Sequence, residues 1–210
     1  MNVLLISLFI VLAAYLLGSI PFAVIFSRLF GLADPRSYGS KNPGATNVLR
    51  SGNKAAATMT LLGDFAKGWL AVFLTKKYGL AHLGLGEGTL ALVAIAVFFG
   101  HLFPIFLKFK GGKGVATAAG VLLAINPWLG ISTLAIWLLT IFLFRYSSLA
   151  ALTAATLAPI LTFFLRGADE ISLAVLILAL ALIAKHWANL QRLIAGNEPK
   201  IGGEKSNPTP

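Results

Sequence analysis

The feature that most constrains this chain is a series of seven apolar stretches separated by short polar or glycine-rich segments. A membrane-spanning helix needs ~20 apolar residues. Six stretches meet or approach that length, whereas the fourth is too short to cross a bilayer alone. Charged residues make up only 11% of the chain, against about 25% in a soluble domain. We therefore expect lipid around most of the chain. The stretches are residues 3–30, 55–78, 89–107, 115–125, 128–144, 148–165 and 171–194.

Lysine and arginine gather after the first, third, fifth and seventh stretches. Cytoplasmic segments of membrane proteins carry an excess of these residues. We therefore expect an all-α polytopic membrane protein of seven transmembrane helices, with its N-terminus outside, its C-terminus cytoplasmic, a short fourth helix and a re-entrant-like first cytoplasmic loop. The expected cytoplasmic residues are Arg28, Arg36, Lys41, Arg50, Lys54, Lys108, Lys110, Lys113, Arg145, Lys185, Arg192, Lys200 and Lys205; the expected external ones are Lys76, Lys77 and Arg166.

The composition limits the classes of function. The net charge of +10 is explained by this asymmetry, so we expect no nucleic-acid partner. The chain has no cysteine, which excludes disulfides and thiolate metal sites. The uncharged start lacks the basic residues of a signal peptide, so we expect an uncleaved first span. We expect one integral membrane domain over residues 1–195 and a polar, flexible C-terminal tail over residues 196–210.

The segment of residues 39–50 is the first candidate site. Its glycines let the backbone approach an anion closely, and a helix starting at Ala45 would present free N–H groups and a positive dipole end. The alternative is an ordinary polar loop that obeys the positive-inside rule. The whole run favours an anion site. Its candidate residues are Gly39, Ser40, Lys41, Asn42, Gly44, Thr46, Asn47 and Arg50.

A second glycine- and lysine-rich segment leads directly into the short fourth stretch. Discontinuous membrane helices bind anionic groups at their N-termini. A Walker motif is excluded, because Leu107 stands where its first glycine would be. The alternative is a cluster of lysines that snorkel from a helix end. The candidate residues are His101, Lys108, Gly111, Gly112, Lys113 and Gly114.

Two further groups of polar residues accompany the apolar stretches. Asp64 and Lys67 lie three apart, so we expect an ion pair that packs the helices, with a proton relay or substrate contact as the alternative.

In the seventh stretch, helical spacing places Lys185, Asn189 and Arg192 on one face. The histidine beside them either has a structural role or hydrogen-bonds a substrate and carries a proton. The candidates at this end are Arg145, Ser147, His186 and Asn189.

These motifs resemble the bacterial acyl-phosphate:glycerol-3-phosphate acyltransferase family, PlsY, over nearly the whole chain. Two positions depart from the family pattern. Pro43 stands where the family often has an aliphatic residue, and Trp187 stands where it often has arginine. The segments that carry the resemblance are residues 19–22, 39–50, 64–68, 100–104, 110–117 and 195–202.

The resemblance implies transfer of an acyl chain from acyl phosphate to glycerol 3-phosphate at the bacterial inner membrane, with membrane lipid around the protein and the active site facing the cytoplasm. It implies coupling to a soluble enzyme that produces acyl phosphate. An activated donor demands no cofactor and no metal, and no acidic and histidine residues have metal-ligand spacing. The residues expected to act in catalysis are Ser40, Lys41, Asn42, Thr46, Arg50, Lys113 and His186; the other candidates would bind substrate.

Two other classes of protein remain open at this point. An anion transporter would also place short, interrupted helices around a phosphate site, but it predicts matching broken helices in both halves of the chain. A purely structural membrane subunit would leave the two glycine-lysine segments without a role. The sequence has one short stretch without a counterpart, so we favour the acyltransferase.

Overall fold

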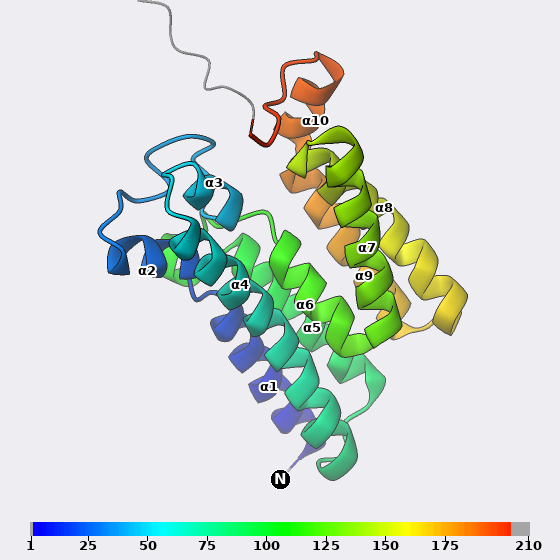
Figure 1. The fold of residues 1–210 in the computed structure, drawn as a ribbon. Coiled ribbons are helices and arrows are strands. Elements are labelled where there is room, and N and C mark those ends of the chain that lie inside the picture. Colours follow the sequence, from blue (N-terminus) through cyan, green and yellow to red (C-terminus); the bar gives the residue numbers. More distant parts are fainter. Residues whose placement is uncertain (1, 203–210) are drawn as a thin grey trace, which may run out of the picture.

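The computed structural model describes residues 2–202, which form a bundle of helices without strands (Figure 1). A π-helix, Thr75–Leu80, continues α4, and a short 3-10 helix, Ile105–Leu107, follows α5. The α-helices are α1 (Val3–Gly18), α2 (Phe22–Leu29), α3 (Ala45–Leu49), α4 (Lys54–Leu74), α5 (Glu87–Leu102), α6 (Val115–Ile125), α7 (Pro127–Phe144), α8 (Ser147–Arg166), α9 (Glu170–Lys185) and α10 (Trp187–Ile194).

Four helical segments of the described part are long and apolar enough to cross a membrane. The number rises to six if each of two bent pairs, α1 with α2 and α9 with α10, is one span. The first stretch is interrupted near Pro21, with a bend of 40° between α1 and α2. The short fourth helix is confirmed, because α6 covers residues 115–125. The four segments are Lys54–Leu80, Glu87–Leu107, Pro127–Phe144 and Ser147–Arg166.

The sequence predicted one continuous helix for the seventh apolar stretch, but the structure has two. The stretch bends by 59° at His186, between α9 and α10. The His186 backbone N–H reaches the carbonyls of Leu182 and Ile183, and its Nδ1 lies 2.9 Å from the Leu182 oxygen. These contacts end α9. The bend therefore separates Lys185 from Asn189, and the predicted shared face was wrong for Lys185. Asn189 and Arg192 both lie on α10, and both contact Glu198.

Small residues bring α4 and α6 close together. A Cβ added at Gly68 would meet the Thr117 carbonyl oxygen, and one added at Gly120 would meet the Phe65 carbonyl oxygen. Membrane helices associate closely where glycine lets their backbones approach. Large apolar side chains elsewhere point outward, including Phe142 in α7. An apolar outer surface of this kind suits lipid. Close packing in the described chain is found between the helices instead.

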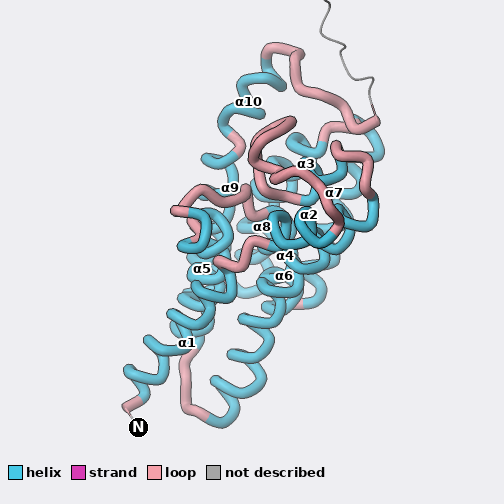
Figure 2. The backbone as a smooth tube through the Cα atoms, turned by 90° about the vertical axis from the view of Figure 1, so that its left-hand side faces the viewer, coloured by secondary structure: helices cyan, strands magenta, loops and turns pink. Residues whose placement is uncertain are grey.

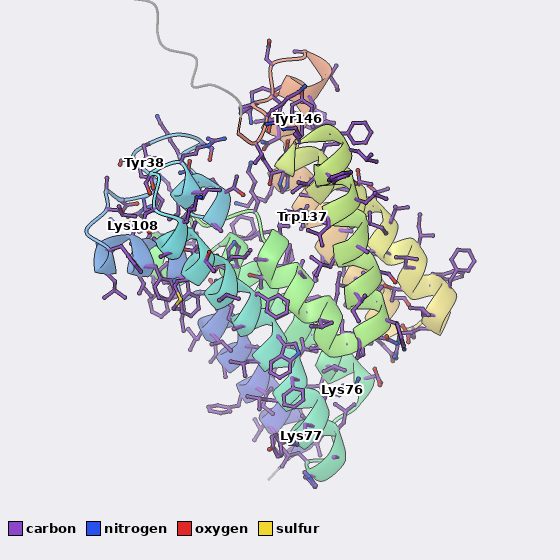
Figure 3. All side chains as sticks on the ribbon, viewed as in Figure 1. Tyr38, Lys76, Lys77, Lys108, Trp137 and Tyr146 are labelled. Carbon is purple, nitrogen blue, oxygen red and sulfur yellow. The ribbon has the colours of Figure 1, made fainter. Side chains whose placement is uncertain are left out.

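The loops that carry the candidate residues lie at one end of the bundle. Figure 3 labels Tyr38, Lys108 and Tyr146 at this end, and Figure 2 shows the connecting loops gathered there. Lys76 and Lys77 lie at the opposite end, near the start of α1 (Figure 3). Segments that are far apart in the sequence therefore share one face of the protein. We call this the loop end.

Candidate functional site

The first candidate segment is folded around the side chain of Asn47, which is fully buried. Its amide nitrogen donates to the carbonyls of Pro35 at 2.6 Å and Tyr38 at 3.2 Å, and its oxygen accepts the Ser40 N–H at 3.0 Å. Both amide protons are therefore used inside the loop. The structure places Asn47 as the residue that fixes the loop around the other candidates.

Most other polar side chains of the same segment lie at the surface. Ser40, Lys41, Thr46 and Arg50 are exposed, and Gly44 caps the N-terminus of α3. Lys41 adopts a left-handed backbone conformation, with φ of 54°. The Arg50 side chain lies across Gly39, where an added Cβ would approach it to 3.2 Å. The loop thus presents two cations and two hydroxyls on a fixed backbone.

The second candidate loop lies tightly against the end of α5. The Gly112 N–H donates to the His101 carbonyl at 3.1 Å, and the Gly111 N–H donates to the Leu102 carbonyl at 3.3 Å. A Cβ at either glycine would overlap His101. Gly114 has φ of 85°, which suits glycine, and α6 begins directly after it. Glycine is therefore required here by packing as well as by backbone conformation.

The second loop and α10 meet through Lys113. Its ammonium group donates a hydrogen bond to the side-chain oxygen of Asn189. The Asn189 amide nitrogen donates to Glu198 at 2.6 Å, and Arg192 Nε donates to the other Glu198 oxygen at 2.7 Å. Ser148, at the start of α8, also donates to Glu198, at 2.7 Å. We call Lys113, Ser148, Asn189, Arg192 and Glu198 the Glu198 network.

Electrostatics within this network set the charge of Lys113. Burial lowers the pKa of Lys113 to about 8, and the positive charges of Arg192 and Arg50 act in the same direction, whereas Glu198 opposes them. For Glu198, burial would raise the pKa, but the hydrogen bonds from Ser148, Asn189 and Arg192 lower it overall. Glu198 is thus a carboxylate at neutral pH. Arg50, in the first candidate loop, is thus near enough to Lys113 to contribute to the lowering of its pKa.

The two remaining candidates from the turn between α7 and α8 have different surroundings. Arg145 donates to the carbonyl of Ile201 at 3.1 Å, and its own carbonyl accepts the Ile201 N–H at 2.7 Å. Residues 196–202, predicted as part of a tail, therefore contact the bundle here; residues 203–210 lie outside the described residues. Ser147 begins α8 beside Ser148. Arg145 holds the C-terminal segment near the Glu198 network.

A cleft of about 750 Å³ opens beside the two candidate loops. Lys41 comes from the first loop, and Lys110 and Phe109 come from the second. Arg36 and its partner Asp34 precede the first loop, and Lys185 lies at the end of α9. Four cations and one aromatic ring thus border a single space. Such a space suits an anionic group attached to an apolar chain.

His186 and His101 are both buried, but they have different partners. The Nδ1 of His186 faces the Leu182 carbonyl, so this nitrogen carries the proton and Nε2 keeps a lone pair. The Nδ1 of His101 lies 3.4 Å from Asp64 Oδ1. The predicted ion pair of Asp64 with Lys67 is confirmed, at 2.8 Å. Among the described residues, no group of three histidine or acidic side chains is arranged to hold a metal.

Sequence reasoning missed the centre of the network. Glu198 and Ser148 were not among the candidates, although Glu198 is the acceptor that joins α8 and α10. One signal was available: Glu198 is the single acid between Lys185 and Lys200, a region with three basic residues. A lone acid among bases at the loop end is a reasonable candidate for pairing.

The chain matches known proteins over most of its length. A family model described as "Glycerol-3-phosphate acyltransferase" matches residues 8–196. A glycerol-3-phosphate acyltransferase of Dechloromonas aromatica is 60% identical over 193 residues, covering 92% of this chain and 95% of that protein. One from Paraburkholderia phymatum is 61% identical over 199 residues, covering 95% and 94%.

The chain belongs to the glycerol-3-phosphate acyltransferase family.

Two solved structures of PlsY (YgiH), described as an integral membrane glycerol 3-phosphate acyltransferase, share the fold. The glycerol 3-phosphate form has a TM-score of 0.85 and 36% identity, covering 93% of this chain and 96% of that one. The lysophosphatidic acid form has a TM-score of 0.84 and 34% identity, covering 93% and 95%. The resemblance to the PlsY family is confirmed. With its apolar helices, this family member is a multi-pass integral membrane protein.

Proposed function

We propose that this protein transfers the acyl group of acyl phosphate to the hydroxyl of sn-glycerol 3-phosphate, giving lysophosphatidic acid (1-acylglycerol 3-phosphate) and phosphate in bacterial phospholipid synthesis. The observation that carries the proposal is that Lys113 of the second loop donates to Asn189, which donates to Glu198, while Arg50 of the first loop is near enough to lower the pKa of Lys113. This arrangement offers two cations from two different loops to substrates that each carry phosphate.

In the proposed reaction, the glycerol hydroxyl oxygen attacks the acyl carbon directly. A new ester bond forms, the bond between the acyl carbon and the phosphate oxygen breaks, and the phosphate leaves with the electron pair. Ser40, Lys41, Asn42, Thr46 and Arg50, with Lys113, would stabilise the phosphates and the departing charge. Fixed donors suit this task because they need no reorganisation as charge develops.

The other substrate-binding candidates would orient glycerol 3-phosphate or hold the loops. Asn189 belongs to the Glu198 network, Ser147 precedes Ser148 of that network, and Arg145 fixes the C-terminal segment. We assign Asn47 to the folding of the first loop, since its amide is fully used there. The remaining substrate-binding candidates are Gly39, Gly44, His101, Lys108, Gly111, Gly112 and Gly114.

The hydroxyl proton has two possible acceptors, the departing phosphate and Nε2 of His186, which keeps a lone pair. A His186→Ala variant separates them, because loss of a base lowers kcat whereas loss of an orienting group raises KM. If turnover stays at the wild-type level and only the KM for glycerol 3-phosphate rises, His186 orients the substrate. In that case the phosphate takes the proton.

We also propose the membrane arrangement. The four single spans, the two bent pairs and α6 would together make seven transmembrane helices. The concentration of lysine and arginine at the loop end favours its cytoplasmic placement in the bacterial inner membrane, with the N-terminus outside. Residues 1–195 would form one membrane domain, and the first loop would be re-entrant-like. A site facing the cytoplasm could receive acyl phosphate from a soluble enzyme that produces it.

One assay tests the function. Purified protein in detergent is mixed with palmitoyl phosphate and glycerol 3-phosphate, and the release of phosphate and the formation of lysophosphatidic acid are followed. Release that depends on both substrates supports the acyltransferase. The acyltransferase proposal fails if no phosphate is released and reconstituted liposomes instead take up glycerol 3-phosphate, which is the result expected of a transporter.

A further inference from the structure

Three charged or titratable side chains form a buried cluster beneath the second loop. Asp64 and Lys67 come from α4, and His101 comes from the end of α5. Their exposed fractions are 3%, 2% and 7%. The Asp64 oxygen Oδ1 lies 2.8 Å from the Lys67 ammonium and 3.4 Å from Nδ1 of His101. One carboxylate thus joins two cationic or donor groups from different helices.

The cluster also contacts the places where helices are interrupted. The Lys67 ammonium donates to the Ile20 carbonyl at 2.9 Å, in the break between α1 and α2. The Thr117 hydroxyl of α6 donates to the backbone carbonyl of Asp64 at 3.0 Å. Because interrupted helices leave free backbone groups, the Lys67 bond satisfies one at the break after α1, whereas the Thr117 bond ties α6 to the middle of α4. The cluster therefore joins α4 to the break after α1 and to α6.

His101 connects this cluster to the substrate loop in two ways. Its backbone carbonyl accepts the Gly112 N–H at 3.1 Å. Its ring lies against Gly112, so closely that an added Cβ would overlap Nε2. A small cavity also borders Asp64, Lys67, His101, Gly111 and Gly112. The position of the Gly112 backbone thus depends on the position of the imidazole ring.

We propose that Asp64, Lys67 and His101 are positioning residues that set the second loop for phosphate binding. This inference rests on the proposed function, since it gives the loop its substrate. Asp64 and Lys67 hold the His101 ring, the ring holds Gly112, and Gly112 sets the place of Lys113 one residue later. Charged groups inside membrane segments are costly and are kept where they serve function. An ion pair of Asp64 and Lys67 that only stabilised the bundle would not need His101 beside the loop.

The first experiment uses Gly112→Ala and His101→Asn. Asparagine keeps a donor toward Asp64 where Nδ1 stands, but it removes the ring edge that faces Gly112. A shift of about 1 Å in a positioning group can cost ~100-fold in rate. We expect Gly112→Ala to lower kcat/KM for glycerol 3-phosphate by about 10- to 100-fold. We expect His101→Asn to restore part of this loss in the double variant, because it makes room for the new Cβ.

The positioning of Gly112 by His101 is overturned if the losses of kcat/KM in the two single variants multiply in the double variant. Losses at independent sites multiply in kcat/KM. A double variant that is worse than Gly112→Ala alone, by the factor seen in His101→Asn alone, would show that the ring does not position Gly112. Melting temperatures in detergent, measured for all three variants, establish that the compared proteins are folded.

The second experiment removes both buried charges together in Asp64→Asn with Lys67→Met. Removing one alone would leave the other charge unpaired inside the protein, whereas a neutral pair is tolerated. The matched control is Lys76→Met at the opposite end, since Lys76 also donates to a backbone carbonyl, that of Ile125. We expect the neutral pair to raise the KM for glycerol 3-phosphate about tenfold, and the control to leave KM and kcat unchanged.

A readout without substrate separates this inference from the proposed function. We expect faster hydrogen exchange of the backbone amides of residues 111–114 in the neutral-pair variant than in the wild type and Lys76→Met, at equal melting temperature. Unchanged exchange and unchanged kinetic constants would overturn the positioning role alone. A wild type without phosphate release would overturn the proposed function, and the exchange measurement would still decide the role of the cluster.

Discussion

The two ends of the bundle carry basic residues in different surroundings. At the end opposite the loops, Lys76 donates to the Ile125 carbonyl, and Arg166 pairs with Glu87 and Asp169. At the loop end, Lys41 and Lys110 border an open cleft with Lys185 and Arg36. Arg36 is paired with Asp34, but the described contacts give Lys41 and Lys110 no carboxylate partner. Cations at one end stabilise helix ends, whereas Lys41 and Lys110 at the other end are available to an anion.

Glycine shows the same contrast. At the loop end, Gly111, Gly112 and Gly114 allow the backbone to lie directly on α5, which places Lys113 beside α10. At the opposite end, the connection before α5 contains Gly84 and Gly86, and an added Cβ would meet nothing at either one. Glycine near a turn therefore indicates a site only where close packing requires it.

The largest effect is expected when Lys113 is compared with Lys76. Lys113→Met removes a cation at the centre of the proposed site, so we expect kcat/KM to fall by about 100- to 1000-fold. Lys76→Met removes a hydrogen bond to the Ile125 carbonyl, which we expect to cost about 1 kcal/mol of stability and no activity. Steady-state kinetics and thermal melting in detergent measure both. Equal losses of activity in the two variants would break the comparison between the ends.

The next effect concerns Glu198. Glu198→Gln keeps the size of the side chain but removes the charge that Arg192 and Asn189 contact. We expect kcat/KM to fall about 10- to 100-fold, because Asn189 no longer holds Lys113 in one place. The exposed Glu170→Gln, at the start of α9, is the matched control and should keep wild-type kinetics. Full activity in the Glu198→Gln variant would show that the Glu198 network is not part of the site.

A smaller effect is expected from pH. The pKa of Lys113 is lowered to about 8, so the free enzyme loses this positive charge as the pH rises through 8. The profile of kcat/KM reports groups of the free enzyme, so we expect it to decline above about pH 8. Lys113→Arg stays charged, because arginine does not deprotonate in proteins. The variant should therefore lose this decline, and an identical decline in both proteins would assign it to another group.

The smallest effect is expected from Arg166→Gln. Its side chain is 28% exposed, and it pairs with Glu87 and Asp169. Ion pairs with this exposure contribute about 0.2–1 kcal/mol. We expect a small drop in melting temperature, unchanged kcat and unchanged KM. A tenfold loss of activity would show that the end opposite the loops takes part in function.

Much of the fold was predictable because it follows from local composition. A run such as residues 90–100 is apolar throughout, and only a helix satisfies its backbone in lipid. The α6 bounds followed from the glycines before Val115 and from Asn126 and Pro127 after it, since glycine ends the loop and Asn126 caps α7. The bend at His186 was not predictable. The hydrogen bonds that end α9 involve the His186 backbone and ring, and the spacing of apolar residues does not reveal them.

Part of the candidate site was also predictable. Residues 39–50 and 110–114 were predicted as cationic, glycine-rich loops, and both lie at the loop end (Figure 3). The individual roles were less accessible. Asn47 has the polar side chain of a ligand-binding residue, yet it is buried within its own loop. Glycine, lysine and asparagine have the same chemistry in a substrate loop and in a structural turn.

The sequence by itself determined that this protein is helical, apolar and basic on one side, because those properties depend on residue type and spacing along the chain. Only the tertiary structure decided which charged residues meet. Asn189 is 76 residues from Lys113 in the sequence (189 minus 113), and Asp64 is 37 from His101 (101 minus 64). Their contacts depend on the packing of α4, α5, α6 and α10, and hydrogen bonds act only over the short distances that this packing creates.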